Sequence, residues 1–212
     1  MMKNSAVILL AHLNPLTNAH EEIILSLNKG YNVYVLPVIF LKNGREITTR
    51  SFPFPYPIRK AMIESSFDGM DIVVLPSYSF ESPFIKYFPP LISPFSWLLR
   101  KKILGNVKEN RFISYTGDTA ERLMLRFYLM HPTQTKRLDI SASNVKELLY
   151  RQAKTSNSSN YKVRHSWEDM VPFKVANIIK DNWIIVERFA NCPDHTVKIM
   201  GMKFPREGLC FS

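Results

Sequence analysis

The sequence predicts an α/β fold built on a doubly wound parallel sheet, and three observations lead to this prediction. Short continuous apolar runs, the first at residues 6–11, are typical of parallel strands that are buried on both faces. Segments with helical spacing of apolar residues alternate with these runs, as they do in βαβ units. With 212 residues, 46% of them hydrophobic, the chain can bury the core of one large domain.

The N-terminal half supplies three strands and two helices in alternation. Residues 6–11 form the first expected strand, and a helix over 18–29 follows it and ends at a glycine. The apolar run 33–41 predicts the second strand, although it contains a proline. A proline at the first helical position opens the helix expected over 57–67. Residues 71–75 then form the third strand.

The C-terminal half continues the alternation and adds further helices. Residues 111–116 predict the fourth strand, and apolar residues on one side predict a helix over 119–130. Helices are also expected over 143–153 and over 167–181, where an internal proline restarts the second of them. Residues 184–188 predict a last short strand. The fold therefore ends in a largely helical segment.

Two stretches fall outside the alternation. Residues 82–106 contain four prolines, several aromatic residues and the basic run Arg100–Lys102, and we interpret them as an insertion with an apolar face. Residues 191–212 are expected to form an irregular C-terminal tail. The prediction is a single domain over residues 1–190, interrupted by this insertion and followed by the tail.

Composition narrows the class of function. The net charge of +10 favours a polyanionic ligand, such as a nucleotide, a nucleic acid or an acidic membrane surface. Signatures of RNA recognition are absent and the longest basic run has three residues, so a nucleic acid is not the expected partner. No apolar run is long enough to span a membrane, and the run at 6–11 is too short for a signal peptide, so we expect a cytoplasmic protein. Two cysteines exclude a disulfide scaffold, and no histidine or cysteine spacing predicts a protein-held metal.

The first group of candidate residues lies where the first strand ends and the first helix begins. Ligands of open α/β sheets bind at this edge, and a helix N-terminus suits a phosphate group. Thr17 can donate a hydroxyl hydrogen bond, His20 lies on the same face of the first turn, and His12 lies at the strand tip. These groups could hold a triphosphate; alternatively, both histidines are satisfied by local contacts.

The second group precedes the helix expected over residues 143–153. Ser141 or Ser143 would cap that helix, and Lys146 lies three positions after the second serine. Two hydroxyl groups, free backbone N–H groups and a cation make a second possible phosphate-binding site. The alternative is an ordinary capped helix with a solvated lysine.

In this order, the two groups resemble the signatures of the nucleotidyltransferase superfamily. Thr17-Asn-Ala-His20 resembles the His/Thr-x-Gly-His signature, and Ile140-Ser-Ala-Ser-Asn-Val-Lys146 resembles the Ile-Ser-Ser/Thr-Thr/Ser-x-x-Arg/Lys signature. The likeness runs from residue 6 to about 189, with a break over the insertion. Three further segments look like those of archaeal-type nicotinamide mononucleotide adenylyltransferases: Pro53-Phe54 with Arg59, Tyr115-Thr-Gly-Asp118 and Trp167-Glu-Asp-Met-Val-Pro172.

This resemblance implies a Rossmann-like fold of the adenine nucleotide alpha hydrolase-like type and a transfer of AMP from ATP to a small phosphorylated acceptor. Pyrophosphate would be released, Mg²⁺ would take part, and nicotinamide mononucleotide in NAD biosynthesis is the first acceptor implied. Relatives are often homo-oligomers, which we also expect. Lys42 fits phosphopantetheine adenylyltransferases, which remain an alternative, as does a CTP-dependent cytidylyltransferase. Ala19 replaces a signature glycine and Ala142 a hydroxyl residue, so an inactive nucleotide-binding homologue is a further alternative.

The resemblance also implies roles for individual residues. His20, Thr17 and Lys146 would be catalytic, whereas Lys42 and Arg59 would bind the acceptor phosphate, with surface charge as their alternative role. Asp118 could equally be a helix cap. Phosphates and water would hold the Mg²⁺, so no protein ligand is assigned to it. The nucleotide would be bound by residues of both signatures and of the fourth strand end: His12, Asn14, Pro15, Ala19, Gly117, Asp118, Ile140, Ser141 and Ser143.

Overall fold

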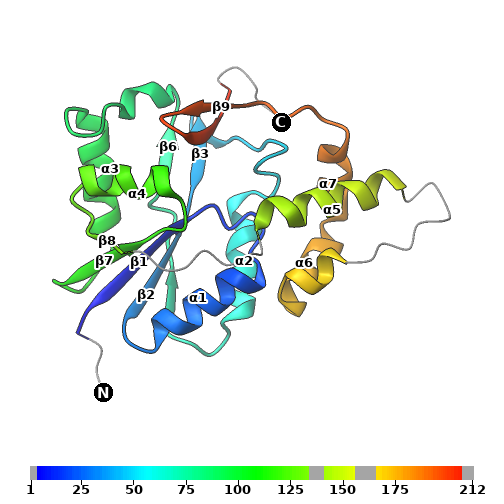
Figure 1. Cartoon of the computed structure of the whole chain (residues 1–212), viewed down its shortest axis with the longest axis horizontal. Coiled ribbons are helices and arrows are strands. Elements are labelled where there is room, and N and C mark those ends of the chain that lie inside the picture. Colours follow the sequence, from blue (N-terminus) through cyan, green and yellow to red (C-terminus); the bar gives the residue numbers. More distant parts are fainter. Residues whose placement is uncertain (1–3, 134–140, 156–165, 207–212) are drawn as a thin grey trace.

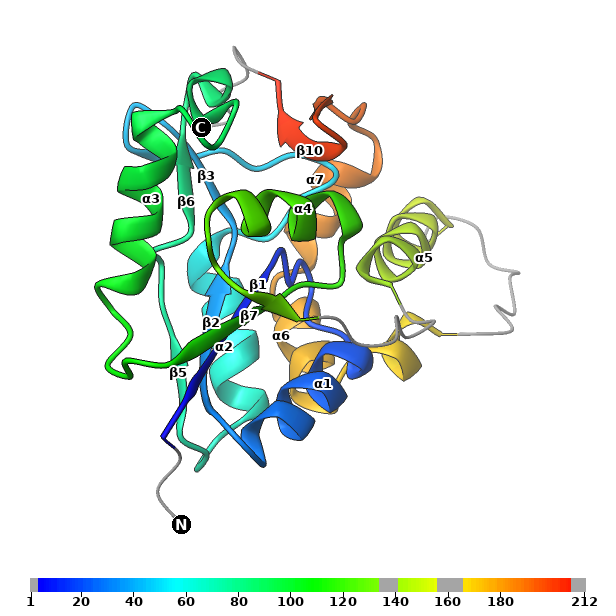
Figure 2. The same cartoon turned by 60° about the vertical axis from the view of Figure 1, so that its left-hand side comes forward.

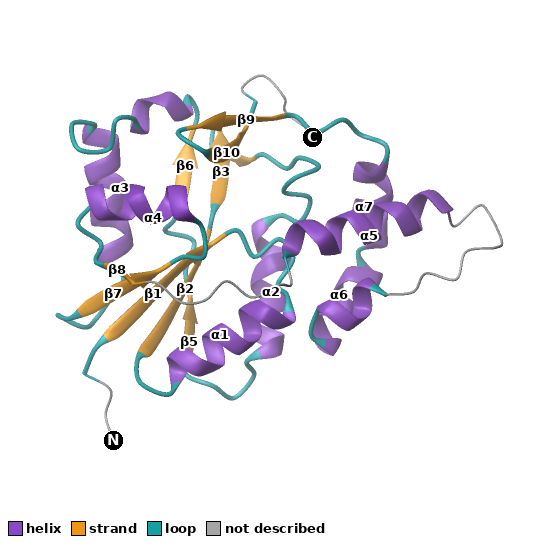
Figure 3. Cartoon of the chain, viewed as in Figure 1, coloured by secondary structure: helices purple, strands orange, loops and turns teal. Residues whose placement is uncertain are grey.

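A computed structural model describes residues 4–133, 141–155 and 166–206 of the chain. Its centre is a five-stranded sheet whose neighbouring strands are all parallel, in the order β5-β2-β1-β7-β8 (Figures 1 and 3). The chain order runs outward from β1 in both directions, so the switch point of a doubly wound sheet lies between β1 and β7. The predicted Rossmann-like α/β class is confirmed. The five strands are β1 (Ala6–Ala11), β2 (Asn32–Pro37), β5 (Ile72–Val74), β7 (Phe112–Tyr115) and β8 (Pro132–Thr133).

Helices cover both faces of this sheet (Figure 2). Val7 and Leu9 of β1 lie in one core, and Ile8 and Leu10 lie in the other, which explains why the run is apolar throughout. The first core is shared with α1 (Asn18–Asn28), α2 (Tyr56–Ser66), α5 (Ala142–Thr155), α6 (Phe173–Asp181) and α7 (Trp183–Ala190). The second core is shared with α3 (Pro94–Leu104) and α4 (Thr119–Phe127).

The strand predicted over residues 33–41 is two strands in different sheets. β2 ends at Pro37, and β3 (Ile39–Lys42) joins β4 (Arg45–Glu46) and β6 (Ser79–Glu81) in a three-stranded sheet. Between the two strands, Val38 N donates to Ala11 O at 3.0 Å, while Val38 O accepts from Arg59 instead of from a strand. Pro37 has no N–H with which to continue the ladder, so the break falls where the chain can change sheets.

The strand predicted over residues 184–188 is wrong, because these residues lie within helix α7. The β-branched run there favours a strand by propensity alone. Val186, Phe189 and Ala190 are buried, whereas Ile184 is 72% exposed. Burial therefore follows the helical period of three to four residues, and packing in the first core overrides the local preference.

The remaining predicted helices and strands are confirmed, with ends that differ by three residues at most. The helix predicted over 167–181 restarts at its proline as expected, as a 3₁₀ turn η2 (Trp167–Met170) followed by α6. The insertion over 82–106 forms a 3₁₀ turn η1 (Phe84–Tyr87) and α3. This insertion exposes apolar side chains such as Ile92 and Leu98. The predicted homo-oligomer stays a prediction. No helix among the described residues is both long and apolar enough to cross a bilayer.

The prediction of an irregular C-terminal tail is wrong for residues 196–205, which form a hairpin. Strands β9 (Thr196–Ile199) and β10 (Met202–Pro205) pair as an antiparallel hairpin. The two turn residues, Met200 and Gly201, have φ of 48° and 86°, the left-handed values that a two-residue hairpin requires. Phe204 is buried in the second core, so the hairpin is packed onto the domain.

Candidate functional site

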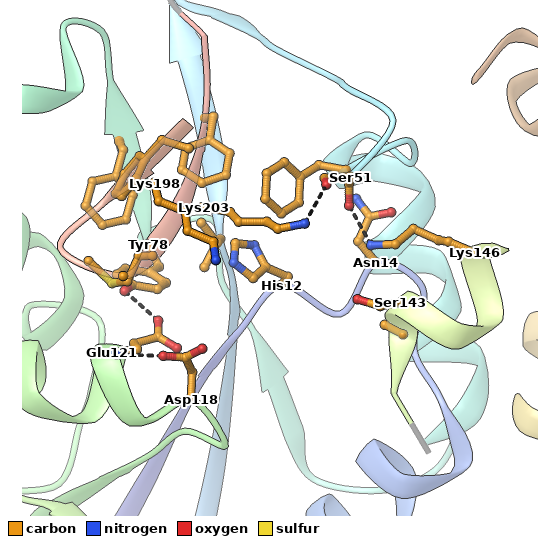
Figure 4. A pocket seen from close by; sticks show the side chains of 18 residues that line it. His12, Asn14, Ser51, Tyr78, Asp118, Glu121, Ser143, Lys146, Lys198 and Lys203 are labelled. Carbon is orange, nitrogen blue, oxygen red and sulfur yellow. Dashed lines mark hydrogen bonds between the residues drawn. The ribbon is translucent and has the colours of Figure 1, made fainter. Parts of the chain in front are cut away.

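A cavity of about 370 Å³ opens at the carboxyl ends of β1 and β7, beside the switch point of the sheet (Figure 4). Residues from seven parts of the chain meet there: the turn after β1, the segments at 38–40, 51–52 and 78–80, the starts of α4 and α5, and the C-terminal hairpin. The volume suits a small molecule, and the position is the one at which open α/β sheets bind ligands. We therefore take this cavity as the candidate site.

The start of α5 forms one wall of the cavity and carries Ser143 and Lys146. The Lys146 Nζ donates to Ser51 O at 2.5 Å, across a sequence separation of 95 residues. Burial, followed by repulsion from Lys203, lowers the pKa of Lys146 to about 8. At neutral pH this lysine is a largely charged ammonium whose charge is poorly solvated, which favours a nearby anion.

His12 lies at the centre of the cavity wall, with Lys146 on one side and Asp118 and Glu121 on the other (Figure 4). Its ring stacks on Phe52 with centroids 4.6 Å apart, and Phe40 lies 6.0 Å away. Burial, and secondly Lys146, lowers the pKa of His12 to about 3. The imidazole is therefore neutral at physiological pH and offers hydrogen bonds rather than charge. Within the described residues, its ring nitrogens form no hydrogen bond.

Asn14 lines the cavity but its side-chain amide is used within the fold. Its Nδ2 donates to Phe54 O at 2.9 Å, and its Oδ1 accepts from Phe54 N at 3.1 Å. This pair of bonds ties the turn after β1 to the segment that carries Ser51 and Phe52. Asn14 thus holds two walls of the cavity together.

The start of α4 forms an acidic wall on the other side (Figure 4). Asp118 is both the N-cap of α4, accepting from Glu121 N at 2.9 Å, and a residue of the cavity. The two oxygens of the buried Glu121 carboxyl accept from Tyr78 Oη at 2.7 Å and from Thr116 Oγ1 at 2.5 Å. Burial raises the pKa of Glu121 to about 7, although both hydroxyl donors oppose this shift.

We expect Glu121→Gln to change how stability depends on pH. The pKa of Glu121 rises from 4.5 to about 7 on folding, so the folded chain binds more protons between these values and its stability falls as pH rises. The glutamine variant loses this dependence and should gain about 3 kcal/mol relative to the parent chain between pH 4 and pH 8. Urea unfolding at the two pH values measures it. The exposed Glu22→Gln is the matched control, and an equal gain there would contradict the assignment.

Thr17 and His20 form a capping box at the start of α1. Thr17 N donates to His20 Nδ1 at 3.1 Å, and His20 N donates to Thr17 Oγ1 at 3.4 Å. Because Nδ1 accepts, the neutral ring carries its proton on Nε2. Burial lowers the pKa of His20 to about 4, so its imidazole is neutral at physiological pH. Neither Thr17 nor His20 lines the cavity.

Other residues predicted for the site lie around the cavity rather than in its wall. Ser141 caps α5 by accepting from Asn144 N at 3.2 Å, and Gly117 adjoins the capping Asp118. Pro15 and Ala19 are buried in the turn after β1 and the first turn of α1. Ile140 lies outside the described residues.

The two predicted acceptor-binding residues also lie away from the cavity wall. Lys42 ends β3 and pairs in register with Arg45. The Arg59 guanidinium is buried; its Nη1 donates to His12 O and Val38 O, each at 2.8 Å, and its Nη2 to Glu46 at 2.8 Å. Contact with a ligand remains a prediction for both, and the observed contacts of Arg59 position the backbone of His12.

Several cavity residues were not predicted from the sequence. They come from segments without a motif: Ser51, Phe52, Tyr78, Phe80, Glu121, Lys198, Met202, Lys203 and Phe204. For the hairpin, one signal was present, since Lys198 and Lys203 flank a Met-Gly turn between apolar residues. Glu121 follows a cap residue by three positions and offers no such signal.

Comparisons with known proteins support the fold. No protein-family model and no curated protein matches the sequence. A bifunctional NMN adenylyltransferase/ADP ribose pyrophosphatase from Francisella tularensis, complexed with AMP and a Mn ion, superposes with a TM-score of 0.57 at 12% identity, over 89% of this chain and 52% of that one. This chain thus spans about half the length of the Francisella protein. A putative nicotinate-nucleotide adenylyltransferase from Vibrio parahaemolyticus superposes with a TM-score of 0.50 at 13% identity, over 88% and 97%. These likenesses establish that the fold is shared.

Proposed function

We propose that the chain is an adenylyltransferase that transfers AMP from ATP to the phosphate of a small acceptor, with nicotinamide mononucleotide as the first candidate. The observation that carries this proposal is the cavity at the switch point, which is lined by the N-terminus of α5, Lys146 and His12. The shared fold with solved adenylyltransferases and the two sequence signatures support it.

In this reaction a phosphate oxygen of the acceptor attacks the α-phosphorus of ATP. A new P–O bond forms there, the bond to the β-phosphate oxygen breaks, and pyrophosphate leaves with that electron pair. The attacking oxygen is already anionic at neutral pH, so no general base is needed. The chain has to position two anions in line and stabilise the charge that develops on the transferred group.

The proposed roles follow from charge and position. Lys146 and the free N–H groups at the start of α5 bind the β- and γ-phosphates, together with Ser141 and Ser143. His20 and Thr17, at the N-terminus of α1, contact the phosphates nearer the reacting phosphorus. His20 is neutral, so it contributes an Nε2–H donor rather than a positive charge.

A divalent cation fits this site as a companion of the triphosphate. Among residues 4–133, 141–155 and 166–206, no group of three or more His, Cys, Asp and Glu side chains is placed to hold a metal ion. We propose that phosphate oxygens and water would hold the cation, and we assign it no protein ligand. When bound, Mg²⁺ would neutralise part of the phosphate charge.

The test is pyrophosphate release in the presence of Mg²⁺, with ATP and CTP assayed separately against nicotinamide mononucleotide, phosphopantetheine and other phosphorylated compounds. We expect release with ATP and one acceptor, and a fall of about 10²-fold in kcat for His20→Ala. His20→Gln is the matched control for folding, because glutamine at this position preserves a capping box while lacking the imidazole.

If His20→Gln were as active as the parent chain, His20 would act only as a cap and not in catalysis. Release with CTP or with phosphopantetheine would support those alternatives. Binding of ATP without release for any acceptor would favour an inactive homologue, consistent with Ala19 and Ala142. A chain that binds neither nucleotide would contradict the proposed reaction.

A further inference from the structure

The C-terminal hairpin forms a wall of the cavity that no motif assigns. Lys198, Gly201, Met202, Lys203 and Phe204 all line it, although their segment lies more than fifty residues beyond Lys146 in the sequence. In Figure 4, Lys198 extends from the hairpin toward His12, while Lys203 reaches Ser51, to which Lys146 also donates. The hairpin therefore forms the part of the cavity wall that adjoins Lys146.

Two ammonium groups converge on one residue, Ser51. Lys146 Nζ donates to Ser51 O at 2.5 Å, and Lys203 Nζ lies 3.3 Å from Ser51 Oγ. Their closeness is also seen in the pKa of Lys146, which Lys203 lowers. Two like charges on one side of a partly buried cavity repel each other, and an anion between them removes this cost.

The carboxylate near this pair is already engaged. Asp194 lies 3.9 Å from Lys203 Nζ, and the same oxygen accepts from Ser51 Oγ at 2.8 Å and from Thr196 Oγ1 at 3.2 Å. Asp194 is thus the carboxylate that pairs with Lys203. Lys198 adds a third ammonium group to the cavity lining. Positive charge is thus in excess where the hairpin meets α5.

Packing fixes the hairpin in this position. The Phe204 ring lies against Phe40, Phe80 and Phe84, with centroids 5.3 to 5.5 Å apart. At the turn, a Cβ added to Gly201 would lie 3.0 Å from the Ala120 Cβ, so the turn is in close contact with α4. The lysines are therefore held near the cavity before any ligand arrives, which lowers the entropy cost of binding.

The opposite wall sets the class of ligand. Asp118 and Glu121 face the same cavity, so phosphate groups are expected at the basic wall and not at this end. A molecule with phosphate at one end and hydrogen-bond donors or a cationic ring at the other matches both walls. A cavity of about 370 Å³ favours a single small molecule of this kind over a polymer.

We propose that Lys198 and Lys203 of the C-terminal hairpin are phosphate-binding residues, which complete with Lys146 a basic wall for the phosphates of the nucleotide or of the acceptor. Their part in turnover rests on the proposed adenylyltransferase function. Their binding of phosphate does not depend on it.

The first test measures binding without turnover. Calorimetry with inorganic triphosphate would compare the parent chain with Lys198→Met, Lys203→Met and the double variant. Lys203 is half exposed, so its variant should fold, and thermal unfolding checks this. We expect each variant to bind about tenfold more weakly, a typical loss for one charge-assisted bond, and the double variant to lose more.

Lys101→Met is the matched control, because it removes one positive charge from exposed α3, outside the cavity. It should alter binding by less than twofold. Equal weakening in Lys101→Met and Lys203→Met would overturn the proposal, since only overall charge would then matter. Unchanged binding by the double variant, or a parent chain that binds no triphosphate, would also overturn it.

Activity then identifies which phosphate the hairpin binds. A tenfold rise in KM for ATP alone assigns it to the triphosphate, and a rise in KM for the acceptor alone assigns it to the acceptor phosphate. If no acceptor is turned over but the double variant loses triphosphate binding, the proposed function fails and the hairpin assignment stands. If turnover occurs with both KM values unchanged, the function stands and the hairpin assignment fails.

Discussion

Lys146→Met is expected to lower kcat/KM for pyrophosphate release by about 10²- to 10³-fold, the loss typical of removing one preorganised group that stabilises transition-state charge. Lys146 is the cavity lysine on the helix that carries the second signature, and its ammonium is fixed by Ser51 O at 2.5 Å. Methionine has a similar length but loses the ammonium, which lies 5.9 Å from the centroid of the Phe52 ring. The charge and the hydrogen bond are therefore what the variant loses.

The matched control is Lys154→Met, in the last turn of the same helix, where the side chain is exposed. It removes the same charge from the same helix and should leave kcat/KM unchanged. If both variants lost activity equally, the effect would come from overall charge or from helix stability. A fully active Lys146→Met would remove this residue from the mechanism.

The pH profile of the same enzyme gives a second readout. The pKa of Lys146 is lowered to about 8 by burial and by Lys203, with Asp194 opposing. The ammonium is lost as pH rises through this value, so kcat/KM should fall above about pH 8. Arginine stays charged over the accessible range, so Lys146→Arg should keep its activity at pH 9 even where its rate at pH 7 is reduced.

The sequence predicts the half of the site that lies next to periodic elements. Residues 6–11 and the capped helix after them are strongly patterned, and their junction places His12 and Asn14 at the sheet edge. Helix α5 is likewise predicted from its cap and period, and it brings Lys146 to the cavity. Each of these steps depends on neighbours within one turn or one strand, which a sequence displays directly.

The other half of the site depends on contacts between distant segments. Lys203 lies 57 positions beyond Lys146, and the packing of the hairpin onto the second core brings the two together. Glu121 faces the cavity because Tyr78, 43 residues earlier, donates to it. No local pattern encodes such pairings. The strand wrongly predicted at 184–188 has the same cause, since contact with the first core determines that α7 is a helix.

Arg59→Met is expected to destabilise the fold by about 3 kcal/mol, near the lower end of the range for breaking a buried ion pair. Arg59 of α2 is 2% exposed. Its guanidinium donates to Glu46 of β4 and to the carbonyls of His12 and Val38, which follow β1 and β2. Methionine leaves two buried carbonyls and a carboxylate without these donors. Urea unfolding at pH 7 measures the loss, with Tm lower by roughly 10 °C.

An exposed ion pair on the same helix, α2, supplies the control for Arg59→Met. Lys60 and Glu64 lie 3.5 Å apart with exposed side chains, so Lys60→Met should cost less than about 0.5 kcal/mol. Arg59→Met combined with Glu46→Met should cost less than the sum of the single variants, because no unpaired carboxylate is then left. Glu46 also accepts from Tyr56 N at 2.7 Å, so part of the loss in Glu46→Met belongs to the start of α2.

This experiment also separates two roles for Arg59. If it positions the backbone of His12, the variant loses stability, and KM for the acceptor changes no more than kcat does. If it binds the acceptor phosphate, as the resemblance implies, the acceptor KM rises steeply in a chain whose free energy of unfolding is unchanged. The three hydrogen bonds of the guanidinium favour the first outcome, because a group already bound to Glu46, His12 and Val38 has few donors left for a ligand.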